Sequence, residues 1–129
     1  MGWMLLSVGL GGALGAISRY LISLWVTGTF GQPGWMAMFS VNVAGSLMMG
    51  MMVALLTVSS LFNDPIRGFV MIGFLGALTT FSSFALDAYN FFQCGEMLAG
   101  GLYLLSSVCL SVAGFYVVLM VVRLIAGQG

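Results

Sequence analysis

Four long apolar segments alternate with short polar interruptions along the 129-residue chain. The segments run roughly from Trp3 to Val26, from Trp35 to Leu61, from Arg67 to Phe92 and from Met97 to Ile125. Each is longer than the ~20 residues with which an α-helix crosses ~30 Å of hydrocarbon. Turn-forming residues separate them, in the order TGTFGQPG, NDP and QCGE. The pattern predicts one domain over residues 1–129, an all-α bundle of four transmembrane helices.

Composition places the chain in the membrane and removes several functional classes. Hydrophobic residues make up 61% of it and charged residues 5%, against roughly 25% charged residues in a soluble domain. With three basic residues in all, the chain has no basic patch for nucleic acid. It has no histidine, no nucleophile beside a base and no cluster of metal-ligating side chains, so an enzyme is not expected. Cys94 and Cys109 are interpreted as small apolar residues.

The arginines give almost no signal for orientation in the membrane. With four spans, Arg67 and Arg123 fall on the side of the two termini, and Arg19 falls toward the other side. Orientation normally follows an excess of Lys and Arg in the cytoplasmic loops, and two against one is hardly an excess. Either one orientation prevails, or the chain inserts both ways and forms an antiparallel dimer. The small size of the bundle favours a homo-oligomer.

The stretch GALTTFSSF, Gly76 to Phe84, lies in the middle of the third segment. Glycine lowers helix propensity, and β-branched threonine adds strain against the preceding turn. A break in the helix here would expose backbone groups, which membranes tolerate only where protein or a cavity satisfies them. Such breaks near the midplane build ion sites from backbone and helix ends. The alternative is a kinked helix whose hydroxyl groups pack internally.

Other polar residues inside the spans indicate a pathway. Polar groups at membrane depth are costly unless they face protein or water, and Asn42 and Arg19 both lie at such depth. Arg19 either lines an aqueous vestibule that attracts anions or snorkels to the membrane surface. Tyr103, Ser107 and Ser111 are spaced four apart and share one face of the fourth helix. They form either an uncharged polar track for a small ion or hydroxyls bonded to their own helix.

Small residues spaced four apart predict close approach between helices. Gly11 and Gly15 form one such pair in the first segment, and Ser46 and Gly50 form another in the second. This spacing allows two backbones in lipid to come into van der Waals contact. The interpretation is structural, because it says only that the bundle is compact.

Several of these motifs together resemble one family. GGALGAISRY resembles the GGxxGAxxRY of the small bacterial fluoride channels, the Fluc or CrcB family. VNVAGSLMMG is similar to that family's VNxxGxFxxG, and GALTTFSSF to its GGxTTFSTF. Tyr103, Ser107 and Ser111 fall where the family has its hydroxyl track. The resemblance covers all four predicted helices in order.

The resemblance implies a function and a set of site residues. The family forms dual-topology antiparallel homodimers with two pores, which pass fluoride passively across the cytoplasmic membrane and relieve fluoride toxicity. Phe81 and Phe84 match the two pore phenylalanines, whose ring edges are electropositive and meet the anion. Asn42 matches the asparagine that donates to fluoride. The remaining matches are Ser82 and Ser83 beside the phenylalanines and Arg19 in the vestibule.

The resemblance also implies a structural sodium ion at the centre of the dimer. The ligands would be the backbone carbonyls of Gly76 and Thr79. The chain departs from the family pattern at four positions. Met38 stands for a common threonine, Phe39 for leucine, Ala85 for a frequent serine and Asp87 for the usual glutamate.

Two other functions remain as alternatives. A small dual-topology multidrug or cation antiporter also has four helices, but it needs a carboxylate embedded in the membrane. Here the carboxylates are Asp64, Asp87 and Glu96, all near span ends or in loops. In the second alternative, a subunit that assembles without transporting, the hydroxyl track would only hold helices together.

Overall fold

The computed structural model describes residues 1–31, 33–58 and 63–127, and this part of the chain is helical apart from short connections. Three spans are single helices, namely α1 (Gly2–Phe30), α2 (Gly34–Val58) and α6 (Met97–Ile125). The third span is α3 (Asp64–Arg67), η1 (Gly68–Leu75), α4 (Gly76–Leu78) and α5 (Phe81–Gln93) in succession. Within the described residues, four helical stretches are long and apolar enough to cross a membrane, which confirms the predicted fold class.

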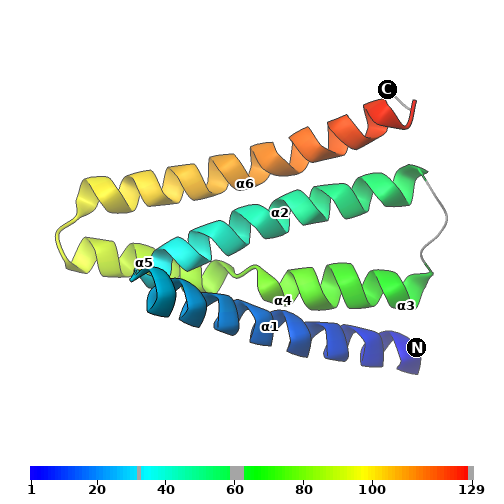
Figure 1. Cartoon of the computed structure of the whole chain (residues 1–129), viewed down its shortest axis with the longest axis horizontal. Helices are drawn as coiled ribbons and strands as arrows, with labels where there is room; N and C mark the ends of the chain where they lie inside the picture. Colours follow the sequence, from blue (N-terminus) through cyan, green and yellow to red (C-terminus); the bar gives the residue numbers. More distant parts are fainter. Residues whose placement is uncertain (32, 59–62, 128–129) are drawn as a thin grey trace.

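The four spans run in alternating directions, so that both ends of the chain lie at the same end of the bundle (Figure 1). α6 packs along α2, and α1 packs along η1. The third span joins these two pairs, because η1 and α4 contact α1 while α5 contacts α6. The predicted end of the second segment, Leu61, lies outside the described residues.

Glycines allow the closest approaches between helices. Gly11 and Gly15 are buried, and a Cβ on either would collide with the backbone carbonyl oxygen of Phe69 or Phe74 in the third span. A Cβ on Gly50 would meet the carbonyl oxygen of Phe115 in α6 in the same way. These contacts confirm the predicted role of the glycines. They also fix the third span against α1, and α2 against α6, with little freedom to slide.

The third span departs from an α-helix twice. Its η1 segment is a π-helix of eight residues, a form that is rare and often found at functional sites. Three residues after η1, α4 ends, and Thr79 (φ −79°, ψ 146°) and Thr80 (φ −149°, ψ 123°) adopt extended conformations. α5 then begins at Phe81. The break predicted at the centre of the third helix is therefore confirmed, and the alternative of a continuous kinked helix is wrong.

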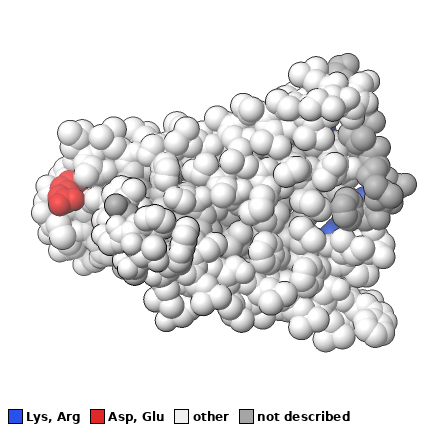
Figure 2. All heavy atoms as spheres, viewed as in Figure 1, with Lys and Arg blue, Asp and Glu red and all other residues white. Residues whose placement is uncertain are grey.

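The outer surface is apolar over most of its area. Large hydrophobic side chains on α1 and α6 are exposed, and among the described residues the largest side chain that is fully buried is that of Leu75. On the face in Figure 2 the acidic atoms lie at one end of the bundle and the basic atoms at the other, with an uncharged region between them. The chain is a multi-pass integral membrane protein, and lipid or another protein surface covers this apolar exterior.

Candidate functional site

A cavity of about 410 Å³ lies beside the break in the third span. Side chains and backbone from α2, the third span and α6 line it. The lining includes seven predicted site residues, Asn42, Gly76, Thr79, Phe81, Phe84, Ser107 and Ser111, together with Ser46, Thr80, Val108 and Val112. No carboxylate and no arginine is among these residues. The cavity therefore offers amide, hydroxyl, backbone and aromatic groups, with no formal charge.

Asn42 is bound to the backbone of the break. Its Oδ1 accepts a hydrogen bond of 2.8 Å from the amide N–H of Thr80, and its Nδ2 donates to the carbonyl oxygen of Thr80 at 3.3 Å. A backbone group left unpaired at this depth costs about 1–3 kcal/mol. A side chain of α2 thus satisfies both backbone groups of one residue in the extended segment, and the second N–H of the Asn42 amide remains for another acceptor.

The Thr80 side chain starts the next helix. Thr80 is the N-cap of α5, and its Oγ1 accepts from the amide N–H of Ser83 at 3.4 Å. The same oxygen lies 3.1 Å from Ser82 Oγ and donates to Ser83 Oγ at 3.5 Å. Ser82 is exposed and does not line this cavity. It does not line a second cavity, beside Arg19, either. The structure thus places predicted Ser82 at the capping oxygen, outside the cavity.

A row of aromatic rings runs from the cavity into the protein. The ring centroids of Phe81 and Phe84 are 5.4 Å apart, and those of Phe84 and Tyr103 are 5.3 Å apart. Phe84 is buried at 7% exposure, whereas Phe81 is 77% exposed within the single chain. Trp35 and Phe91 continue the row beyond Tyr103. The tilted geometry of these pairs leaves ring edges available to an electron-rich partner.

The hydroxyl track predicted on α6 is divided in the structure. Ser107 is 4% exposed, and its Oγ has no hydrogen-bond partner among the described residues. Ser111 lines the same cavity one turn further along α6. Tyr103 lies outside the lining, and its hydroxyl donates to Asp87 Oδ2 at 3.2 Å. Buried polar groups rarely lack a hydrogen-bond partner, so of these three hydroxyl groups that of Ser107 is the one expected to bind a further partner.

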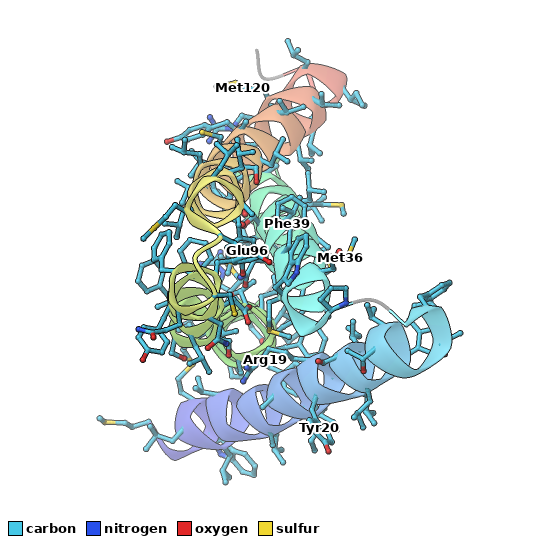
Figure 3. The ribbon with its side chains drawn as sticks, turned by 90° about the vertical axis from the view of Figure 1, so that its left-hand side faces the viewer. Arg19, Tyr20, Met36, Phe39, Glu96 and Met120 are labelled. Atoms are coloured by element: carbon cyan, nitrogen blue, oxygen red, sulfur yellow. The ribbon has the colours of Figure 1, made fainter. Side chains whose placement is uncertain are left out.

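Arg19 is turned into the bundle, and Tyr20 is on the opposite side of α1 (Figure 3). The Nη1 of Arg19 donates to Ser83 Oγ at 3.2 Å, and the Nε of Arg19 is buried without a partner among the described residues. Arg19 and Ser83 line a second cavity of about 330 Å³, together with Met38 and Asp87. This placement favours the predicted vestibule over a side chain that snorkels along the outside of its helix. Two of the departures from the family pattern, Met38 and Asp87, thus lie beside Arg19.

Two parts of this site were missed by sequence reasoning. Thr80 was not singled out, although a threonine directly before a helix is a common N-cap and gives a usable signal. The hydrogen bond between Tyr103 and Asp87 was also missed. It joins two helices through residues sixteen positions apart, and no local spacing reports such a contact.

The fold and the site define a class, a small four-span membrane protein with a neutral polar and aromatic cavity at a broken helix. Residues 6–119 match the family model described as CrcB-like protein, Camphor Resistance (CrcB). The chain therefore belongs to the CrcB family.

Proteins similar to the chain over nearly their whole length carry one name. A Francisella philomiragia protein named Fluoride-specific ion channel FluC is 40% identical, over 95% of this chain and 100% of its own. A Rhizobium etli protein of that name is 37% identical, over 92% of this chain and 94% of its own. FluC 1 of Nitrobacter hamburgensis is 34% identical, over 97% of this chain and 100% of its own.

Proposed function

We propose that this protein is a fluoride channel that passes the anion passively across the cytoplasmic membrane and so relieves fluoride toxicity. The observation that carries the proposal is membership of the CrcB family, with full-length relatives named as fluoride-specific channels. The cavity at the break supports it independently. A small, strongly hydrated anion needs hydrogen-bond donors to replace its water, and Asn42, Ser107 and Ser111 supply them.

The two phenylalanines give this pathway its anion preference in our proposal. The edge of an aromatic ring is positive, so the edges of Phe81 and Phe84 would stabilise fluoride without binding it as tightly as a fixed positive charge. The free N–H of the Asn42 amide would donate to the anion between them. Arg19 would supply the positive charge of the neighbouring vestibule, whose lining also holds Asp87, and Ser83 would hold the guanidinium in place. Tyr103 would end the hydroxyl track, where its hydroxyl donates to Asp87.

We further propose an antiparallel homodimer with two pathways. Phe81 lines the cavity and is 77% exposed in the single chain, so a second copy packed against it would add to the walls. The apolar exterior offers area for such an interface, and two arginines against one give almost no signal for a single orientation.

A sodium ion at the centre of this dimer is also part of the proposal. Gly76 and Thr79 both line the cavity at the break, and their carbonyls are neutral oxygen ligands of the kind that hard monovalent cations accept. Among the described residues no group of three His, Cys, Asp or Glu side chains could hold a metal ion. Any cation ligands near the cavity would therefore be neutral oxygens, which suits a monovalent ion.

Sodium removal gives a test of this part. Fluoride flux should persist with no sodium gradient across the membrane, because the ion is structural. Flux should fail once sodium is removed from the purified protein and replaced by a large organic cation. If flux instead scales with the sodium gradient, the protein is a coupled transporter and the structural ion is wrong.

The antiporter is not retained as an alternative. Family membership supports a channel, and none of the residues that line the cavity at the break is a carboxylate that could exchange protons for a cationic substrate. In a subunit that assembles without transport, the buried Ser107 Oγ, which has no hydrogen-bond partner among the described residues, would have no ion to bind. An ion channel is not an enzyme, and we propose no catalysis.

Anion efflux from liposomes tests the proposed function. Liposomes holding the purified protein and loaded with both fluoride and chloride should release fluoride rapidly when a potassium ionophore balances the charge. Chloride should stay inside over the same period. Efflux of neither ion would favour the assembly subunit, and proton exchange driven by a cationic drug would bring back the antiporter.

A further inference from the structure

At the break, two backbone amides donate to side-chain oxygens, whereas in a continuous helix they would donate to backbone carbonyls. In an α-helix the amide of each residue donates to the carbonyl four positions earlier. The amide of Thr80 would thus donate to Gly76, and the amide of Ser83 to Thr79. In the structure the amide of Thr80 donates to Asn42 Oδ1 at 2.8 Å, and that of Ser83 to Thr80 Oγ1 at 3.4 Å.

The residue before these two keeps its helical bond. The amide of Thr79 donates to the carbonyl oxygen of Leu75 at 3.0 Å, and the Thr79 hydroxyl donates to the same oxygen at 2.9 Å. The carbonyl oxygen of Leu75 therefore accepts two hydrogen bonds from Thr79 at the end of α4. The next donor along the chain is taken by a side chain of another span, and the carbonyl of Gly76 loses the partner that helix geometry would give it.

We propose that Asn42 and Thr80 are positioning residues, which draw two amides away from the helix and so keep the carbonyls of Gly76 and Thr79 available to bind a cation. The inference rests on the sodium site proposed above and adds what holds that site open. Without these two acceptors, the amides of Thr80 and Ser83 would have to regain their helical carbonyls or stay unpaired, and a buried unpaired amide is costly.

The same side chains connect the break to the vestibule. Thr80 Oγ1 lies 3.5 Å from Ser83 Oγ, and that hydroxyl accepts from Arg19 Nη1 at 3.2 Å. Asn42 comes from α2 and bonds to the extended segment itself, whereas Arg19 comes from α1 and bonds to Ser83 in the first turn of α5. Gly45 packs in the same region, where an added Cβ would strike the Thr79 side chain. The conformation of the break thus depends on contacts outside the third span.

Thr80→Val is the sharpest variant, because valine keeps the shape of threonine and removes the hydroxyl oxygen. The measurement is the melting temperature of the purified protein as sodium chloride replaces N-methyl-D-glucamine chloride at constant ionic strength. A ligand that binds only the folded state stabilises it by RT ln(1 + [L]/Kd), so the melting temperature starts to rise once the sodium concentration exceeds the dissociation constant of the site. We expect Thr80→Val to shift this rise to sodium concentrations at least about tenfold higher, as a tenfold weaker site would. Its fluoride flux should fall by a similar factor.

Conservative and matched variants separate this role from general destabilisation. Thr80→Ser restores the capping oxygen and should return the sodium response toward that of the unmodified protein. Thr57→Val removes a threonine hydroxyl that bonds only within α2, to the carbonyl of Ala54 at 2.7 Å, and should leave the sodium response unchanged. Asn42→Ala removes the other acceptor and should weaken the sodium response as Thr80→Val does. It also provides the measurement if Thr80→Val does not purify in folded form.

The outcomes distinguish this inference from the proposed function. An unchanged sodium response in both Thr80→Val and Asn42→Ala would overturn the inference. If the unmodified protein shows no sodium response at all, the sodium site and the inference fall together, while fluoride flux in the same preparation still supports the channel. A protein that responds to sodium but passes no fluoride would overturn the proposed function and leave the inference standing.

Discussion

Fluoride flux is expected to fall at least about tenfold when either Phe81 or Phe84 is replaced by isoleucine, the factor that corresponds to ~1.4 kcal/mol of lost stabilisation along the pathway. Isoleucine keeps much of the apolar bulk of phenylalanine but has no electropositive ring edge. The measurement is fluoride efflux from liposomes, with gel filtration of each variant to show that the assembly is intact.

The two positions differ in a way that sharpens the test. Phe84 is buried against Tyr103, so Phe84→Ile also disturbs packing, and a loss of flux there has two causes. Phe81 is 77% exposed within the chain and contributes little to the core of its own protomer. A large loss from Phe81→Ile therefore points to the pathway, or to the partner subunit that we propose to cover it.

Phe30→Ile is the matched control. Phe30 is 55% exposed at the end of α1, contacts Trp25 edge to face, and lines neither of the two cavities. It should leave flux close to that of the unmodified protein. Equal and mild effects at all three positions would mean that Phe81 and Phe84 are ordinary packing residues, and the aromatic pathway would be wrong.

Hydropathy predicts the fold because a membrane imposes simple requirements. A span must be long, apolar and internally hydrogen-bonded, and all of these leave a mark in the sequence. The break was predictable for a related reason, since glycine and paired threonines are poor helix formers in a segment that is otherwise strongly apolar. The π-helical segment of Gly68–Leu75 was not predictable. Its residues GFVMIGFL are equally suited to an α-helix, and their pattern does not distinguish the two forms.

Thr79 and Thr80 show why details of the site are harder to predict. They are adjacent and chemically identical, yet the hydroxyl of Thr79 bonds back to Leu75 in its own helix, while that of Thr80 caps the next helix. The difference arises from backbone angles and from Asn42, which lies 38 positions away from Thr80. Spacing along one helix groups Ser107 with Ser111 correctly, but contacts between helices decide which partner each hydroxyl obtains.

Forcing a single orientation is expected to abolish transport altogether. Two lysines added at the C-terminus would join Arg67 and Arg123 on one side of the membrane and give four basic residues against Arg19 alone. Such an excess directs that side to the cytoplasm. If the active form is an antiparallel dimer, a population with one orientation cannot assemble it. Fluoride efflux should fall to the level of protein-free liposomes, and cells that depend on the protein should become sensitive to fluoride.

An oppositely biased partner should restore function. Gln93→Lys, Cys94→Lys and Arg123→Gln together give three basic residues on the other side of the membrane, against Arg67 alone. The two lysines lie at the exposed last residue of α5 and in the turn that follows it. Each biased protein should be inactive alone, and the two should be active when they are expressed together. Two glutamines added at the C-terminus form the control, because they match the added length without the charge. Normal transport by either biased protein alone would rule out the antiparallel assembly, since every copy would then have the same orientation.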